Sequence, residues 1–406
     1  MGVIGGAEAE YDVRSAGKPR AKPARMPSAG AVFSAVLIFA AASAAALAYV
    51  VGGELSAAGF SRAWASLAAG GREAVFAFED GFDDIFADIG DAVVSAGPSG
   101  AAVYDGVGEE MYRESFAMAN PAIAAAPGGM LAVVYDSGGK SARAAGRSGI
   151  TVPLTLESEI VSCAVGRGGV FAVTTRGAGE YKGRVEFFRL SGGVPEKIYD
   201  WFSGEGPALG AAVSRSGKSF AALTLTARGG RIVLLDSGST EPRGEYVHRD
   251  GAILELAYMA SGTLIARADG ALIAVSENGE GKVIRDFTGR ELDGYACGDA
   301  FIVMHLSRAD GGGELVSMDE RGAELGRIET SRGLVWLSAA GDRAAVLRSD
   351  GLSLYDRELR LVASYPDASG ASCAFPRGKT GAGAWGEGEG RIFAGSGGLL
   401  IKSKKG

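Results

Sequence analysis

The segment that decides the fold is residues 337–365, LSAAGDRAAVLRSDGLSLYDRELRLVASY. Two short apolar runs flank Gly341-Asp342, a second turn follows at Asp350-Gly351, and the next run, GLSLYD, ends in a polar residue. Glycine tolerates the positive φ that tight hairpin turns require, so these dipeptides indicate antiparallel hairpins. A fourth run, LRLVASY at Leu359–Tyr365, completes the unit. The segment therefore predicts four short antiparallel strands.

The run that closes in a polar residue recurs along the chain. Its copies end at Asp105, Arg189, Asp236, Ser276, Asp319, Asp356 and Ser396. One gap is twice the usual length and contains a degenerate copy, KSARAAG at Lys140–Gly146. With this copy counted, the interval is about 42 residues, a period typical of a four-stranded propeller blade. Blades are expected to start near residues 84, 121, 160, 208, 252, 293, 334 and 371. The sequence thus predicts an all-β, eight-bladed β-propeller, or a seven-bladed one if the first or last copy is incomplete.

The first strand of each repeat is expected to be rich in small residues, because it crowds against its neighbours around a central axis. Such runs are AIAAA at Ala122–Ala126, VSCAV at Val161–Val165, LGAAV at Leu209–Val213, YAC at Tyr295–Cys297 and SCAF at Ser372–Phe375. Closing the ring would pair an early strand with the last copy and remove exposed sheet edges. The candidate early strand is AVFAF at Ala74–Phe78, and its partner is expected near Gly397–Ile401.

The N-terminal part has a different composition. Residues 14–25 carry five basic side chains and no acid, and the 23 residues Ala29–Val51 carry no charge. A helix of that length extends about 34 Å, enough to cross a hydrocarbon core of about 30 Å. We therefore predict a basic cytoplasmic tail at 1–28, a transmembrane helix at 29–52, a connector at 53–80 and the propeller at 81–402. A cleaved signal peptide, with Ser56 and Ala58 before the cleavage site, is the alternative, although the long leader and long apolar run favour an uncleaved anchor.

Charge determines the expected orientation and partners. Basic residues close to a span are retained in the cytoplasm, so the N-terminus should be cytoplasmic and the propeller extracytoplasmic, in a single-pass protein of the cell membrane. The chain has a net charge of -7: residues 1–30 hold 5 basic and 3 acidic side chains, which leaves 36 basic and 45 acidic ones in the rest. An acidic exterior domain repels nucleic acid and anionic lipid, so neither is an expected partner of the propeller.

The residues after 84 resemble the WD40-like and quinoprotein-like eight-bladed propellers, and the span plus propeller resembles an uncharacterised bacterial family of single-pass, membrane-anchored propellers. Where WD40 blades end in Trp-Asp, this chain has Tyr104-Asp105, Leu235-Asp236, Met318-Asp319 and Tyr355-Asp356, and it has no Gly-His pair. Trp201, Trp336 and Trp385 do not sit in the Trp-ending docking motif of the quinone-binding families. The resemblance therefore implies the fold and no cofactor.

Three Gly-Lys-Ser/Thr tripeptides match only part of the phosphate-binding loop motif. Gly139-Lys140-Ser141, Gly217-Lys218-Ser219 and Gly378-Lys379-Thr380 all lack the glycine that a P-loop has five residues earlier, so hairpin turns are expected instead. GAGAWG at Gly381–Gly386 matches the dinucleotide fingerprint by letter, but it lacks the preceding strand and following helix.

Titratable residues form no recognisable site. An acidic cluster consists of Glu79, Asp80, Asp83, Asp84, Asp88 and Asp91. It lacks the spacing of a calcium-binding loop, so a solvated acidic turn is expected. His248 is expected to end an outer strand and His305 to face a blade interface, and Cys163, Cys297 and Cys373 are read as small buried apolar residues. No catalytic, cofactor-binding or metal-binding residue is predicted.

Two function classes remain. The first is a non-catalytic interaction scaffold at the cell envelope that binds a protein, peptide or polymer through its loops. The alternative is an extracytoplasmic enzyme of hydrolase or lyase type with a site at the channel mouth. A sensor that signals through the span is limited by a cytoplasmic part of about 28 residues. Fold alone does not choose among them; an aromatic docking face would favour the scaffold, and converging carboxylates, arginines and tyrosines would favour the enzyme.

Overall fold

The computed structural model describes residues 74–77, 85–90, 92–106, 108–126, 128–308, 312–331, 333–378, 381–386 and 389–393. All of them belong to one compact unit, Trp64–Gly406. The predicted tail at 1–28 and transmembrane helix at 29–52 lie outside these residues, as does most of the connector. Within the described part, the one helical element is the 3-10 turn η1 (Pro366–Ala368), and no helix is long and apolar enough to cross a membrane.

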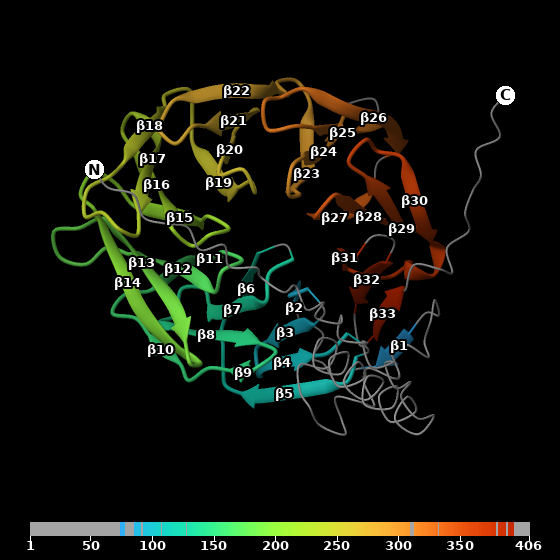
Figure 1. Cartoon of the computed structure of the whole chain (residues 1–406), viewed down its shortest axis with the longest axis horizontal. Coiled ribbons are helices and arrows are strands. Elements are labelled where there is room, and N and C mark those ends of the chain that lie inside the picture. The colour runs from blue at the N-terminus through green and yellow to red at the C-terminus, as the bar shows by residue number, and fades with distance from the viewer. Residues whose placement is uncertain are drawn as a thin grey trace, which may run out of the picture. The chain divides into compact units, whose positions relative to one another are not determined.

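Eight antiparallel sheets surround a central axis (Figure 1), and each is one blade. The blades are: blade 1, β2 (Ile85–Asp88), β3 (Val93–Gly97), β4 (Gly100–Tyr104) and β5 (Glu110–Ser115); blade 2, β6 (Pro121–Ala125), β7 (Leu131–Asp136), β8 (Ser141–Gly146), β9 (Gly149–Ile150) and β10 (Leu154–Thr155); blade 3, β11 (Ile160–Val165), β12 (Val170–Arg176), β13 (Gly183–Ser191) and β14 (Val194–Ser203); blade 4, β15 (Ala208–Val213), β16 (Ser219–Thr226), β17 (Gly229–Asp236) and β18 (Gly244–His248); blade 5, β19 (Ile253–Tyr258), β20 (Leu264–Ala268), β21 (Ala271–Val275) and β22 (Gly281–Asp286); blade 6, β23 (Glu291–Cys297), β24 (Ile302–Ser307), β25 (Gly312–Met318) and β26 (Glu324–Ser331); blade 7, β27 (Leu334–Ala340), β28 (Arg343–Arg348), β29 (Gly351–Asp356) and β30 (Leu361–Tyr365); blade 8, β31 (Cys373–Arg377), β32 (Gly381–Gly386), β33 (Glu389–Phe393) and β1 (Ala74–Ala77).

The prediction of an all-β, eight-bladed propeller is confirmed, and the seven-bladed alternative is wrong. Each first strand starts within two residues of its predicted position, for example β11 at Ile160 and β15 at Ala208. The small-residue runs are the first strands of their blades, and the runs that close in a polar residue are the third strands. The repeat in the sequence is therefore the blade itself.

The polar residue that ends many third strands caps the turn that follows. In blade 6, Asp319 Oδ1 accepts hydrogen bonds from the backbone N–H groups of Arg321 (2.9 Å) and Ala323 (2.8 Å). In blade 7, Asp356 Oδ1 accepts them from Glu358 (3.0 Å) and Arg360 (2.9 Å). A short carboxylate side chain that bonds the backbone two residues on stabilises such a turn. This local chemistry explains why the repeat is visible in the sequence.

Ring closure uses the predicted early strand but a different partner. β1 pairs antiparallel with β33, with Ala74 opposite Ile392 and Ala77 opposite Glu389. The expectation of a partner near Gly397–Ile401 is wrong, because the third strand β33 lies directly beside β1, which takes the place of the fourth strand. β1 lies inside the segment 53–80 assigned to the connector, so the propeller takes one strand from that segment.

The motif expectations are met where the structure describes them. Gly139–Ser141 and Gly217–Ser219 lie at the hairpins that join β7 to β8 and β15 to β16, and Gly217 has φ +65°. Lys379 and Thr380 lie outside the described residues, and GAGAWG is the whole of strand β32. None of these segments opens a helix, so none has the geometry of a phosphate-binding loop.

The blades pack through apolar faces. Strand β24 is buried along its whole length, with Met304 and Leu306 packed toward blade 5 and Val303 toward blade 7. Neighbouring first strands are also linked by hydroxyl groups: Ser162 Oγ donates to the Leu209 carbonyl (3.2 Å) and Ser338 Oγ to the Ala374 carbonyl (2.6 Å). The first strands therefore form a fixed inner wall.

Candidate functional site: the central cavity and its two mouths

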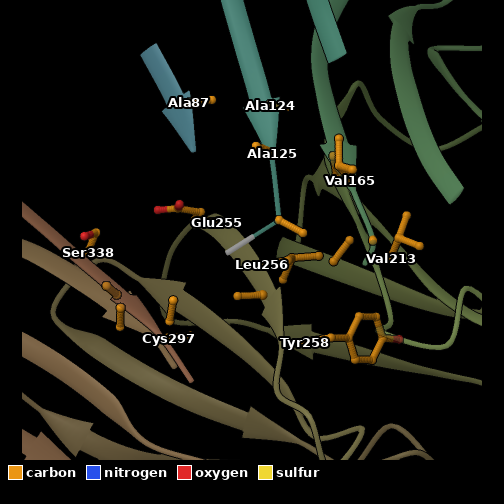
Figure 2. A pocket seen from close by; sticks show the side chains of 18 of the residues that line it. Ala87, Ala124, Ala125, Val165, Val213, Glu255, Leu256, Tyr258, Cys297 and Ser338 are labelled. Atoms are coloured by element: carbon orange, nitrogen blue, oxygen red, sulfur yellow. The ribbon is translucent and has the colours of Figure 1, made fainter. Parts of the chain in front are cut away.

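A cavity of about 630 Å³ lies inside the inner wall and is lined by the first strands of all eight blades. Figure 2 shows that many of the side chains facing it are small, among them Ala87, Ala124 and Ala125, while the carboxylate of Glu255 projects into it from β19. Its volume falls within the range of about 300–1,000 Å³ that ligand pockets occupy. The cavity is therefore the first candidate for a binding site.

The two ends of the cavity open on different faces. We call the upper face the one where first strands begin and second strands end, and the lower face the one where first strands end and second strands begin. In blade 3, for example, Ile160 is paired with Thr175 at the upper face, and Val165 is paired with Phe171 near the lower face. The lower face also holds the hairpins between third and fourth strands.

A β-bulge lies at the upper end of the first strand in five consecutive blades. The register shifts leave one unpaired residue in each strand: Val161, Leu209, Leu254, Asp293 and Val335. Bulges redirect side chains out of the regular alternation of a strand. Four of the five residues are apolar, and Leu209 and Leu254 line the cavity. The bulges therefore give the upper mouth an apolar rim.

Large apolar side chains are exposed mainly on this upper face. Twelve such side chains are exposed among the described residues, and seven lie on the upper face: Ile85, Tyr181, Phe202, Leu225, Leu254, Val335 and Trp336. Tyr181 and Phe202 contact each other with ring centroids 4.6 Å apart, and Trp336 packs edge-on against Phe375 at 5.9 Å. A second hollow of about 850 Å³ lies on the same face, and Leu209 lines both it and the cavity.

The lower mouth is crossed by ion pairs between distant blades. Asp299, which follows β23 in blade 6, contacts Arg167 of blade 3 at 2.5 Å and Arg215 of blade 4 at 3.1 Å. All three residues line the cavity. Burial alone would raise the pKa of Asp299, but the hydrogen bonds and charges of the two guanidinium groups outweigh it and lower the pKa. The carboxylate is therefore held ionised between two arginines.

The thiol and phenol groups of the cavity are poorly suited to act as nucleophiles. Burial, with a smaller contribution from the Glu255 charge, raises the pKa of Cys297 to about 12. Burial also raises the pKa of Cys163 and of Tyr258, whose hydroxyl has no hydrogen-bond partner among the described residues. All three cysteines are unpaired first-strand residues; Cys373 is buried as predicted, whereas Cys163 and Cys297 are only half-buried because they line the cavity.

The two histidines lie outside the cavity. His248 ends β18, the fourth strand of blade 4, as predicted. His305 is fully buried on β24, where its Nδ1 contacts Asp293 Oδ2 at 2.6 Å and its Nε2 contacts Thr330 Oγ1 at 2.8 Å. The opposite residue, Leu315, packs toward blade 7, so His305 faces that interface as expected. This chain of hydrogen bonds was missed in the sequence because its members come from three strands.

The acidic cluster is described at one position. Asp88 is buried and pairs with Arg377 of blade 8 at 2.7 Å, while the other five acids lie outside the described residues. Burial raises the pKa of Asp88, and the charge and hydrogen bond of Arg377 offset this only in part. In the described part of the chain no three His, Cys, Asp or Glu side chains are placed to hold a metal ion together.

A sequence model of a family of unknown function, DUF5711, matches residues 75–365, from β1 to the end of blade 7. The chain belongs to this family. No curated protein matches the DUF5711 chain significantly in sequence. Two solved structures share its fold. Sqt1 from Saccharomyces cerevisiae has a TM-score of 0.57 at 12% identity and covers 78% of this chain and 97% of its own. BamB from Moraxella catarrhalis has a TM-score of 0.51 at 15% identity and covers 79% and 98%.

Identities this low establish similarity of fold alone. The comparisons agree with the sequence-based resemblance to propellers and with membership of a family of unknown function. The bacterial origin and the membrane anchor of the DUF5711 chain stay predictions.

Proposed function

We propose that this protein is a membrane-anchored interaction scaffold that binds a protein or peptide partner at the upper face of its propeller. The observation that carries the proposal is that, of the twelve large apolar side chains exposed in the described part of the chain, seven lie on that face. Aromatic and aliphatic anchors around a concave centre are typical of binding hot spots. Rigid strands that present them lower the entropy lost on binding.

The side chains that line the hollow beside the cavity indicate which side chains the partner presents. It is lined by Tyr181, Lys182 and Arg176, and by the apolar Ile160 and Leu209. Arg176 pairs with the exposed Glu159 at 2.9 Å, an ion pair that a partner carboxylate could replace because both side chains are solvated. We infer a partner segment in which apolar side chains flank an acidic residue.

The location is part of the proposal. The uncharged run Ala29–Val51 and the basic residues before it support a single span with a cytoplasmic N-terminus. The partner would then be an envelope protein or peptide.

Labelling of an introduced cysteine tests this location. Asp342→Cys places a thiol at a position whose native side chain is 66% exposed. Burial raises the pKa of the three native thiols, so they react slowly with a maleimide. A membrane-impermeant maleimide should label the variant in intact cells; labelling only after lysis would place the propeller in the cytoplasm.

The alternative, a hydrolase or lyase with a site at the channel mouth, has less support. The carboxylates that face the cavity are engaged, Glu255 with Arg267 at 3.2 Å and Asp299 with two arginines. The thiols lining the cavity have raised pKa values and are protonated at neutral pH. We therefore prefer the scaffold.

Site-specific photo-crosslinking tests the binding face. The photo-crosslinker p-benzoylphenylalanine replaces Leu254 on the upper face or Val283 on the outer strand of the same blade, whose side chains are 50% and 51% exposed. The full chain is expressed in its native membranes and irradiated. Capture of one protein in stoichiometric yield from position 254 and not from 283 supports the proposal. Equal capture at both positions, or capture from 283 alone, contradicts it.

A further inference from the structure

The lower mouth places two guanidinium groups at one end of the central cavity. Arg167, Arg215 and Asp299 together carry one net positive charge, and their side chains are 20%, 50% and 32% exposed. Arg167 reaches across from blade 3 and Arg215 from the neighbouring blade 4 to a single carboxylate in blade 6. One carboxylate cannot neutralise two arginines, so the cluster attracts a second anion.

The guanidinium groups retain donors for that anion. Each arginine has five N–H donors, and the contacts to Asp299 use Nη2 of Arg167 and Nη1 of Arg215. The guanidinium of Arg167 lies beside Gly128, where an added Cβ would be 3.6 Å from Arg167 Nη2. An added Cβ there would rest on the flat face of the guanidinium, while its N–H donors point along the plane. A ligand carboxylate would take these in-plane donors in competition with Asp299.

The rest of the cavity suits an apolar body. Above the arginines the wall includes small apolar residues, among them Ala211, Ala257 and Ala339, and a few polar ones such as Ser338. The carboxylate of Glu255 projects into the same space (Figure 2) and is paired one-to-one with Arg267 at 3.2 Å, so this part of the wall has no excess positive charge to hold an anion. An anionic group is thus favoured only at the lower end, which fixes the orientation of a ligand in the cavity.

We propose that the central cavity binds a small amphipathic monocarboxylate, with its carboxylate on Arg167 and Arg215 and its apolar body directed toward the upper mouth. Asp299 is then a built-in competitor that occupies the arginines when the ligand is absent. The arginines lie at the mouth opposite the protein-binding upper face, although Leu254 and Trp336 belong to both the cavity wall and that face.

Isothermal titration calorimetry with three matched probes tests the proposal. Hexanoate, the neutral hexanamide and the cationic hexylammonium are titrated into the full chain in lipid nanodiscs, with empty nanodiscs as the blank. We expect one hexanoate per chain, bound at least ~10-fold more tightly than hexanamide because charge-assisted hydrogen bonds to arginine exceed neutral ones. Equal affinity for hexanoate and hexanamide, or absence of binding by all three probes, overturns the proposal.

Three variants separate the site from a general effect of charge. Arg215→Gln leaves the Arg167–Asp299 pair intact and should reduce the preference for hexanoate over hexanamide by ~10-fold. Asp299→Asn removes the competitor and should tighten hexanoate binding by ~10-fold with hexanamide unchanged. The control is Arg360→Gln, because Arg360 lies on the lower face of blade 7 in an ion pair with Asp356 but does not line the cavity. Circular dichroism shows whether Asp299→Asn is folded. Weaker hexanoate binding by the folded Asp299→Asn protein contradicts the proposal, and so does a loss of hexanoate preference in Arg360→Gln equal to that in Arg215→Gln. If Asp299→Asn is unfolded, Arg215→Gln alone decides the test.

Discussion

Arg167 and Asp299 are 132 residues apart in the chain and meet at 2.5 Å, which ties blade 3 to blade 6 across the lower mouth of the cavity. Most contacts of a propeller blade are with its two neighbours, so a bond that spans the ring restrains blades that otherwise do not touch. Arg215 of blade 4 joins the same carboxylate at 3.1 Å. The ion pairs at the lower mouth therefore connect blades that are not neighbours in the ring.

Removal of this carboxylate should destabilise the propeller in a pH-dependent way. Asp299→Ala is expected to lower the free energy of unfolding by about 1–2 kcal/mol near pH 7, since the ion pairs are partly solvated. The folded-state pKa of Asp299 is lowered from 3.8, so its contribution is complete above that pH and is lost as the pH falls through the folded-state value. Urea denaturation of both proteins between about pH 7 and pH 3 measures the difference, which should shrink only below about pH 4. A difference that grows on acidification would show that another group is responsible.

The ion pair between Asp88 and Arg377 should matter more, because it joins blade 1 to blade 8 and its side chains are 6% and 12% exposed. Arg377→Met leaves a buried carboxylate without its cationic partner and should cost about 3 kcal/mol. Removal of both charges in Asp88→Leu with Arg377→Met should cost clearly less than the single change, as measured by thermal unfolding. Additive losses would mean that the two charges do not stabilise each other.

Pairing of β1 with β33 should be required for a stable ring. Val75→Pro fixes the backbone φ in the middle of β1, opposite Arg391, and its ring restricts the preceding residue, which should disturb the pairing with β33. We expect a lower melting temperature and faster amide exchange in β33, measured by hydrogen exchange and mass spectrometry. Val75→Ala keeps the backbone donor and is the control. Unchanged exchange in β33 of the proline variant would contradict the closure.

The histidine within blade 6 should be structural. His305→Gln loses part of a buried network with Asp293 and Thr330 and should cost about 1–3 kcal/mol of stability while leaving capture of the partner unchanged. Thr330→Val removes only the bond at Nε2 and should cost less. Chemical denaturation alongside the crosslinking assay distinguishes the roles, since a stable His305→Gln protein that no longer captures its partner would assign a functional role instead.

Trp336 should be a hot spot of the upper face. It is 38% exposed and held by its edge-on contact with Phe375, so its truncation removes an ordered aromatic surface. Trp336→Ala is expected to weaken partner binding by about 2 kcal/mol, or ~30-fold, with a small effect on stability. Leu361→Ala, at an exposed outer strand of the same blade, is the matched control. Equal losses in the two variants, measured by titration of the captured partner, would contradict the assignment of the face.

The fold was predictable because its signals are local. Hairpin glycines and capping residues such as Asp319 and Asp356 recur with the blade, and runs of small residues mark most of the first strands. The partner of β1 was predicted too far along the chain, near Gly397–Ile401 instead of at β33. The repeat indicates that blade 8 needs a fourth strand, but it does not show that β1 itself is that strand.

The candidate sites depend on features that a period does not contain. The unpaired bulge positions, such as Leu254, arise from register shifts of one residue between paired strands. The cluster depends on loops of the neighbouring blades 3 and 4, which carry Arg167 and Arg215, and on a loop of blade 6, which carries Asp299. In the printed chain these are ordinary charged residues after a strand, and only the closed ring brings them together.

Closure by β1 also sets the order of events during synthesis. Ala74 emerges from the ribosome roughly three hundred residues before its partner Ile392. Strand β1 therefore stays without its partner β33 while the other blades are made. Contacts between such distant parts of a chain form late and slowly. During that interval the unpaired edge is open to chaperones, proteases or other nascent chains, and translation speed bears directly on the yield of finished protein.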